Sequence, residues 1–457
     1  MVKHIVILGA GISGLATAWF LKKLLGSSVQ LTLLEANSRA GGWIQTIHSQ
    51  DFLFETGPRS CRSKGSGREM LQLIEELGLC DEIIGAHSSA NLRFLYFQKK
   101  LQPLPNSFFH ILFNPLVKGW LKAVYRDLNS PRTSKKDESI EEFFSRRIGK
   151  EWTSRLIDPF VSGIYAGDCK KLSVKSCFPL FWKWEQENGS LIKGIWNQKK
   201  EKKSSSAFVS HWMKQPLFSF KQGMGYLIQS FVQQLDANIH FSSTVKAIEM
   251  EKEGATVVLD NGKVFKADHL ISSLPASKLA PLLGSEFSET ASLLQSMEST
   301  SVMVVNCGYR RPVLKKSGFG YLIPFQEKES ILGCVWDSAV FPKQNFSPEH
   351  TRLTVMMGGT QHPQIDDRQK GLALALSSIE RHLAIDSVPD EVYVSLAKQA
   401  IPQYQIGHYL TLINLSRSLS LYPQFTFTGH SFDGVSVNDR VLQARLLADK
   451  IAKSFNI

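Results

Sequence analysis

The sequence predicts an α/β protein, and three features of its 457 residues lead to that prediction. The first 35 residues read as a strand, a glycine-rich turn, a helix and a second strand. Residues from about 86 to 215 are rich in Phe and Trp and read as mostly helical. Residues from about 300 to 400 carry several short strands, which are typical of a mixed or antiparallel sheet. A chain of this length suffices for two or three domains with hydrophobic cores.

The N-terminal unit has the order of elements that a dinucleotide-binding fold requires. An apolar run, Ile5–Leu8, leads into Gly9-Ala10-Gly11-Ile12-Ser13-Gly14. Apolar residues then recur at helical spacing, and an alternating strand, Val29–Leu34, ends at Glu35. This order predicts a Rossmann-like domain with a nucleotide at the glycine turn.

Each residue type in this turn has a physical role. Gly9 permits the tight turn, Gly11 lets a pyrophosphate approach the backbone, and Gly14 lets the helix pack closely on the strand. The helix start at Ile12-Ser13 offers free N–H groups to phosphates. Glu35 is placed to accept hydrogen bonds from ribose hydroxyls and would repel a 2′-phosphate, so an unphosphorylated ribose is expected.

Net charge and cysteine spacing limit the kinds of partner and the cellular compartment that we expect for this protein. Lys plus Arg exceed Asp plus Glu by 53 − 41 = 12, which favours anionic partners, but no basic stripe interleaved with aromatics indicates nucleic acid. The six cysteines show neither CxxC nor metal-ligand spacing, so we expect reduced thiols and a cytoplasmic protein without a metal. The N-terminus enters the first strand directly, which argues against a leader peptide.

One segment raises the question of a membrane. No stretch of about 20 apolar residues occurs, so no spanning helix is expected. The segment Phe108–Lys122 combines aromatic, aliphatic and basic residues around a proline. It is compatible with peripheral contact to the inner face of a membrane and equally with a buried helix pair.

The order of elements predicts three regions. Residues 1–85, 220–295 and 400–457 would form a discontinuous nucleotide-binding domain, residues 86–219 a helical domain that contacts substrate or membrane, and residues 296–399 a mixed α/β substrate domain. Within the first, Asp260-Asn261-Gly262 predicts a hairpin with a type I′ turn. A strand over Phe425–Gly429 is followed by a long helix, for which Asn438 is the predicted N-cap.

Two further motifs extend the nucleotide site. Arg39-Ala40-Gly41-Gly42-Trp43 follows the acidic strand end, and its glycine pair again permits close backbone approach, while Arg39 adds positive charge for a phosphate. Phe54-Glu55-Thr56-Gly57-Pro58-Arg59 comes next. Together these motifs resemble the flavin-dependent oxidase superfamily, which includes amine oxidases, phytoene desaturases and protoporphyrinogen oxidases. The resemblance implies FAD as cofactor.

Within that superfamily the chain resembles the protoporphyrinogen/coproporphyrinogen oxidase family from end to end. The resemblance lies in Asn91–Tyr96, Pro159–Asp168, Gly318–Pro324, Ala400–Tyr404 and Gly434–Asp439, although Arg440 stands where many members have cysteine. It implies a haem-biosynthetic enzyme that oxidises protoporphyrinogen IX to protoporphyrin IX. Six hydrogens would leave in three rounds of hydride transfer to the flavin, each followed by reoxidation by O2 to give H2O2.

The resemblance also implies site residues by position. For the cofactor these are Gly9, Gly11, Ile12, Ser13, Gly14, Glu35, Arg39, Gly42, Trp43, Gly57, Pro58, Arg59, Ser60, Val245, Val435, Ser436 and Val437. Arg93 would pair with a substrate propionate, and Gly163 would leave room at the reacting carbon, so both are expected catalytic-site residues. Leu322 and Trp336 would sandwich the tetrapyrrole, unless Trp336 is only a core residue.

The sequence leaves alternatives open. The substrate could be coproporphyrinogen III, with four propionates. The same fold serves flavin-free GTPase dissociation inhibitors that bind prenylated partners, although the intact glycine loop argues against that class. An amine oxidase fits the Arg93 segment less well. A homodimer and a downstream chelatase are compatible with the sequence, which decides neither.

Overall fold

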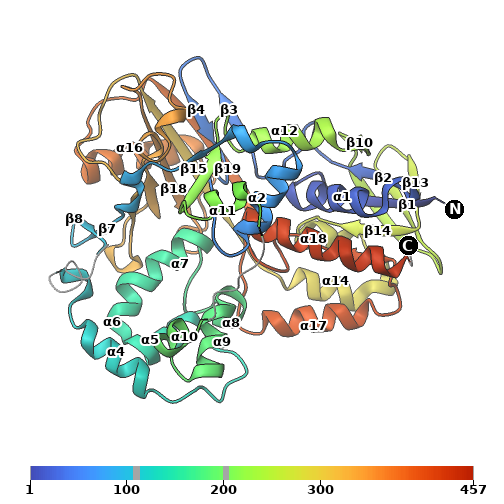
Figure 1. The fold of residues 1–457 in the computed structure, drawn as a ribbon, viewed down its shortest axis with the longest axis horizontal. Coiled ribbons are helices and arrows are strands. Elements are labelled where there is room, and N and C mark those ends of the chain that lie inside the picture. Colours follow the sequence, from blue (N-terminus) through green and yellow to red (C-terminus); the bar gives the residue numbers. More distant parts are fainter. Residues whose placement is uncertain (1, 106–113, 199–204, 456–457) are drawn as a thin grey trace.

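The fold is built around a parallel five-stranded sheet, seen edge-on at the right of Figure 1. The computed structural model describes residues 2–105, 114–198 and 205–455. The strand order is β10-β2-β1-β14-β20. The bounds are β1 (Lys3–Leu8), β2 (Val29–Leu34), β10 (Asn238–His240), β14 (His269–Ser272) and β20 (Phe425–Phe427). This one sheet therefore draws strands from both ends and the middle of the chain.

The central strand explains the two layers that cover the sheet. Residues Ile5–Leu8 of β1 are fully buried, because both faces of a parallel sheet are covered. Ile5 and Ile7 pack in one core with α1 (Ile12–Leu25) and α18 (Val437–Ser454). Val6 and Leu8 pack in a second core on the other face, beneath a smaller antiparallel sheet.

The smaller sheet corrects one detail of the sequence prediction. It consists of β11 (Val245–Met250), β12 (Ala255–Leu259) and β13 (Val264–Ala267). The β12–β13 hairpin forms as predicted, but its turn is not type I′, because only Gly262 has a positive φ (82°). Gly262 N donates to Leu259 O at 3.0 Å, so the three-residue loop is a turn closed by one left-handed glycine.

A seven-stranded mixed sheet forms the second large layer, at the upper left of Figure 1. Its order is β19 (Glu391–Pro402), β15 (Ser299–Tyr309), β18 (Thr351–Gly358), β17 (Gly333–Val335), β16 (Gly320–Leu322), β7 (Phe94–Phe97) and β8 (Lys100–Pro103). Helix α16 (Arg368–Leu383) covers one face. The sequence assigned residues 94–103 to the helical region. All four residues of β7 are buried, so no alternation of exposed and buried positions marked the strand.

The remaining elements connect these layers. Short sheets are formed by β3 (Thr46–His48) with β4 (Leu53–Glu55), and by β5 (Cys61–Arg62), β9 (Leu217–Phe220) and β6 (Ile83–Gly85). Further helices are α2 (Gly67–Glu76), α12 (Gly225–Gln234), α13 (Ala276–Leu279), α14 (Ser288–Gln295), α15 (Asp337–Val340) and α17 (His408–Ser418).

The helical region forms the lower left of Figure 1. Its helices are α4 (Trp120–Asn129), α5 (Ile140–Ile148), α6 (Lys150–Trp152), α7 (Asp158–Tyr165), α8 (Val174–Cys177), α9 (Pro179–Asn188) and α10 (Leu191–Asn197). Helix α11 (Ala207–Trp212) lies apart from them, against α2 near the centre of the view. Across the described residues, none of the helices has the length and apolar composition needed to cross a bilayer. The first part of the predicted membrane-contact segment, residues 108–113, lies outside the described residues.

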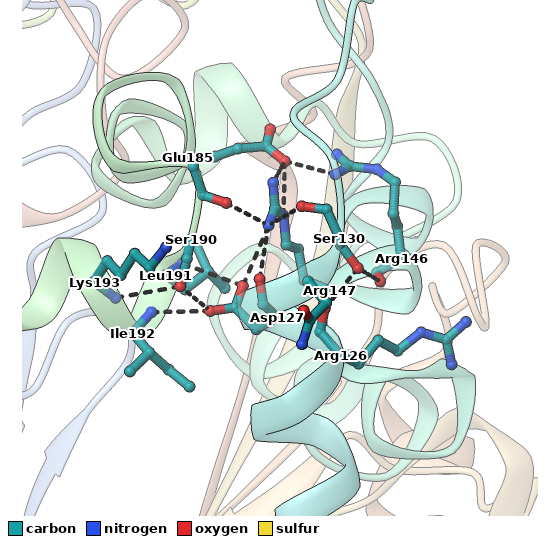
Figure 2. A network of polar contacts seen from close by, with 12 residues as sticks. Arg126, Asp127, Ser130, Arg146, Arg147, Glu185, Ser190, Leu191, Ile192 and Lys193 are labelled. Atoms are coloured by element: carbon teal, nitrogen blue, oxygen red, sulfur yellow. Dashed lines mark hydrogen bonds and ion pairs between the residues drawn. The ribbon is translucent and has the colours of Figure 1, made fainter.

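A buried polar network holds four of these helices together (Figure 2). Arg147 and Glu185 are fully buried, and Arg147 Nε donates to Glu185 Oε1 at 2.7 Å. Arg146 Nη1 donates to the same oxygen at 2.6 Å. Asp127 accepts hydrogen bonds from Ser190 Oγ at 2.6 Å and from Ile192 N at 3.0 Å, at the start of α10. Because every charge is paired, α4, α5, α9 and α10 are joined as one unit.

Candidate functional site

The glycine turn after β1 leaves room for a ligand at one position and none at another. Gly9 has a φ of 94°, which gives the turn its left-handed geometry. A Cβ on Gly14 would lie 2.1 Å from Gly9 O, so α1 packs directly on the turn. A Cβ on Gly11 would meet only Gly42 Cα, at 4.0 Å. The space in front of Gly11 and the first N–H groups of α1, at Ile12-Ser13, therefore suit a diphosphate.

Glu35 closes the same turn from the end of β2. Its carboxylate accepts hydrogen bonds from Ala10 N at 2.8 Å and from Asn37 N at 2.9 Å. Ser243 N donates to the backbone oxygen of Glu35 at 2.8 Å, which brings the start of β11 at Val245 toward this acid. The structure thus gives Glu35 a second role, which the sequence analysis missed, in fixing the glycine turn.

The second glycine loop lies directly against the first. Gly41 and Gly42 both have positive φ, 107° and 57°, and Gly41 N donates to Ala10 O at 2.8 Å. The Arg39 guanidinium donates to Ala40 O at 3.0 Å and to Gly42 O at 2.9 Å. Arg39 therefore holds the loop closed while it contributes the predicted positive charge.

The loop Gly57-Pro58-Arg59-Ser60 is anchored at both ends. A Cβ on Gly57 would lie 2.1 Å from Trp43 O, so the two loops touch. Arg59 Nη1 pairs with Asp337 Oδ1 at 3.1 Å, and both side chains are mostly buried. Asp337 begins α15, so this pair ties the loop to the seven-stranded sheet. The sequence offered no signal for Asp337, because its partner is 278 residues away.

Glu55, which precedes this loop, is a buried acid with an unusual pKa. It accepts hydrogen bonds from Met224 N at 2.7 Å and from Thr46 Oγ1 at 2.9 Å. Burial raises the pKa of Glu55 from 4.5 to about 7, and these two bonds and Arg59 only partly oppose the shift. The sequence analysis assigned no role to this residue.

The N-cap of α18 differs from the predicted one. Ser436, not Asn438, is the N-cap, and its Oγ accepts a hydrogen bond from Asp439 N at 3.1 Å. Asn438 lies inside the first turn, where its Nδ2 donates to Arg62 O at 2.7 Å. Ser is among the strongest N-cap residues, and Asn438 is engaged elsewhere. The predicted segment Val435-Ser436-Val437 therefore leads directly into this helix N-terminus.

Arg93 is an exposed cation at the start of β7. Its guanidinium carbon lies 5.2 Å from the centre of the Phe319 ring. Partial desolvation and then repulsion from Arg62 lower the pKa of Arg93. Among the described residues, no carboxylate forms an ion pair with Arg93 or Arg62. Two adjacent cations without an acidic partner suit a ligand with carboxylates.

Gly163 and Leu322 are brought together across two elements. Gly163 is exposed on α7, and a Cβ there would lie 2.8 Å from Leu322 Cδ2 of β16. Asp158, at the start of α7, accepts a hydrogen bond from Phe325 N at 2.7 Å, which fixes α7 beside the end of β16. Burial raises the pKa of Asp158, and this bond partly opposes the shift.

Trp336 does not lie beside these residues. It is 0% exposed and packs with Phe94 and Tyr321 in the core beneath α16. Leu322 packs on the other face of the sheet with Leu95. Neighbouring residues along a strand point to opposite faces, so Tyr321 and Leu322 divide between the two sides. The structure thus separates Trp336 from Leu322 and gives Trp336 the core position.

Comparisons with known proteins agree with this geometry. The family model for flavin-containing amine oxidoreductases matches residues 12–452. The chain belongs to the flavin-containing amine oxidoreductases. The predicted α/β fold class and the flavin cofactor FAD are therefore confirmed. The open space at Gly11 and the free N–H groups at the start of α1 are compatible with the diphosphate of this cofactor.

Individual relatives narrow the comparison. Protoporphyrinogen oxidase of Bos taurus is 33% identical, over 99% of this chain and 98% of its own. Coproporphyrinogen III oxidase of Bacillus subtilis (strain 168) is 31% identical, over 97% and 96%. A crystal structure from Exiguobacterium sp. 255-15 has a TM-score of 0.84 at 23% identity and covers 99% of both chains, which shows the same fold.

Two glycine variants separate packing from cofactor binding. Gly14→Ala places a methyl group against Gly9 O and is expected to lower the free energy of unfolding by at least about 2–3 kcal/mol, with or without flavin. Gly11→Ala meets no close protein atom, so the flavin-free protein should lose only about 1 kcal/mol or less, while flavin retention falls sharply. Thermal unfolding and flavin absorbance measure the two effects. Full flavin occupancy in Gly11→Ala would contradict this site.

Glu55 should make stability depend on pH. The pKa of Glu55 is higher in the folded protein than in the unfolded chain, so the folded state holds more protons between about pH 4.5 and 7. The free energy of unfolding should therefore fall as pH rises through that interval, by on the order of 2 kcal/mol. Urea unfolding at pH 5 and pH 8 tests this. Glu55→Gln should remove that part of the pH dependence, and an unchanged difference would contradict the assignment.

Proposed function

We propose that this protein is an FAD-dependent porphyrinogen oxidase that converts protoporphyrinogen IX to protoporphyrin IX with O2 as the acceptor. The full-length similarity to relatives named protoporphyrinogen oxidase and coproporphyrinogen III oxidase carries the proposal. FAD, held at the glycine turn, would supply a two-electron acceptor. In the overall reaction the six hydrogens removed from protoporphyrinogen IX would reduce three O2 to three H2O2.

The chain's own residues have positioning roles in this proposal. Arg93, with Arg62 nearby, would bind a propionate through parallel N–H donors. Gly163 would let the macrocycle approach closely, since a side chain at this exposed position would occupy space beside Leu322. The bond from Phe325 N to Asp158 supports this role, because it holds α7 against β16. Such positioning is the main contribution expected of a protein whose cofactor carries the chemistry.

Coproporphyrinogen III is the alternative substrate, and the similarity to the Bacillus subtilis relative favours it about equally. Anaerobic mixing of the flavin-loaded protein with each porphyrinogen, followed by flavin absorbance, distinguishes the two. Faster flavin bleaching by protoporphyrinogen IX supports the proposal, and faster bleaching by coproporphyrinogen III replaces it. A purified protein that stays colourless with excess FAD would instead favour a flavin-free escort protein.

Arg93→Ala should weaken porphyrinogen binding by about 1.5–3 kcal/mol, because a charge-assisted hydrogen bond is lost. The measurement is the porphyrinogen concentration that half-saturates anaerobic flavin reduction. Arg310→Ala is a control with the same change in charge, since Arg310 is half-exposed and pairs with Asp51 at 2.7 Å. Equal half-saturation in wild type and Arg93→Ala would remove Arg93 from the site.

We also propose that one face of the helical region contacts a membrane peripherally. Leu121 and Tyr125 of α4 are 65% and 69% exposed, and Trp196 of the adjacent α10 is 77% exposed. Exposed apolar side chains beside Lys118 and Lys122 suit an anionic bilayer surface.

Replacement of both Leu121 and Tyr125 by Glu should reduce cosedimentation with phosphatidylserine vesicles severalfold, because the apolar contact is lost and negative charge is added. Leu421→Glu is the control, since Leu421 is 83% exposed but follows α17, outside the helical region. Equal sedimentation of the double variant and wild type would contradict this contact.

A further inference from the structure

Helix α7, which carries Gly163, lies where the helical region meets the seven-stranded sheet (Figure 1). Strands β16, β18 and β19 of that sheet run in the same direction, because each is separated from the next by one antiparallel strand. Their C-terminal ends therefore point to the same end of the sheet. A residue that follows each of these three strands hydrogen-bonds to α7 or to its C-cap.

These three contacts hold α7 at both of its ends. At the N-terminal end, Asp158 accepts the hydrogen bond from Phe325 N, which follows β16. At the C-terminal end, the C-cap Ala166 accepts a hydrogen bond on its backbone oxygen from Thr360 N at 2.8 Å, just beyond β18. Tyr165 O accepts one from Gln403 Nε2 at 2.8 Å, just beyond β19. The last carbonyls of a helix have no donor within the helix, so these contacts satisfy groups that would otherwise need water.

Gln403 is the only one of these three partners that reaches α7 with its side chain. It is 7% exposed, and its Nε2 also donates to Ile401 O at 3.2 Å in β19. Its backbone N donates to Glu298 O at 2.9 Å, just before β15. A Cβ on Gly167 would clash with Gln403 Oε1, so the amide packs directly against the chain that leaves α7. The side chain thus joins the end of β19 to the end of α7.

Gly163 lies on α7 between these anchors. A Cβ on Gly163 would lie 2.8 Å from Leu322 Cδ2, and Leu322 belongs to β16 of the same sheet. Because the anchors and Leu322 are parts of one sheet, the hydrogen bonds to α7 set the separation between Gly163 and Leu322. Loss of one anchor would let that end of the helix move relative to the sheet.

We propose that Gln403 is a positioning residue for the porphyrinogen oxidation proposed above, on which this inference rests. Its amide fixes the C-terminal end of α7 and so holds Gly163 where the macrocycle would approach. Arg93 lies at the start of β7, away from this anchor, so loss of the amide should slow the reaction of bound substrate and leave its binding largely intact. A misplacement of about 1 Å can slow a reaction on the order of 100-fold.

Gln403→Met tests the role, since methionine has a similar length but cannot donate to Tyr165 O. Anaerobic mixing of the flavin-loaded protein with the porphyrinogen that bleaches wild type faster gives a saturating rate and a half-saturating concentration. The saturating rate should fall at least about tenfold, while the half-saturating concentration changes less than about twofold. Gln405→Met is the matched control and should react as wild type does, because Gln405 Nε2 donates to Glu298 Oε2 at 2.7 Å and not to α7.

A milder variant keeps the test decisive if Gln403→Met does not fold. Gln403→Asn has an amide too short to reach Tyr165 O and should lower the saturating rate at least about threefold. Equal saturating rates in wild type and either folded variant overturn the proposal. Loss of flavin from Gln403→Asn overturns it as well, because the residue would then act on cofactor retention. If neither porphyrinogen bleaches the wild-type flavin, the proposed function fails, and this inference fails with it.

Discussion

The arrangement of this protein depends on one place where a side chain cannot fit. Gly14 lies so close to the carbonyl of Gly9 that a Cβ would come within 2.1 Å of its oxygen. This contact sets the position of α1 on β1, and therefore the direction of the free N–H groups at the start of the helix. Glu35 and the second glycine loop then bond to Ala10 between these two glycines. The cofactor bed that we propose at this turn would therefore depend on backbone packing more than on any charged side chain.

Long-range polar contacts join the other regions to this bed. Arg59 reaches Asp337 at the seven-stranded sheet, and Asp158 holds α7 beside β16. The Arg59–Asp337 pair is mostly removed from water, so loss of one partner would leave a buried charge unsatisfied. These contacts help to position the Arg59 loop, the seven-stranded sheet that carries Arg93, and helix α7, which carries Gly163. The geometry of the proposed substrate site is therefore a property of the whole fold.

Charges in this chain fall into two groups with different consequences. The Arg147–Glu185 network is internally paired and joins the helices whose outer face carries Leu121 and Trp196. Arg93 and Arg440 have no carboxylate partner among the described residues. Unpaired cations at defined positions are where a protein can gain from an external anion. Of these two cations, Arg93 is exposed at the start of β7 and is therefore the one that we propose binds a substrate anion.

The sequence by itself determined the features that depend on local conformation. The glycine turn, Glu35 at the end of β2 and the hairpin at Gly262 require particular residue types at fixed spacing, so pattern alone predicted them. Tertiary structure decided what depends on distant partners or on the choice of sheet face. Asp337 and Asp158 have such distant partners, and β7 is buried on both faces and shows no period. Side chains alternate between the two faces along each strand, so Leu322 and Trp336 point to opposite faces of the sheet. Only the packing of the other layers decides which face is available to a ligand.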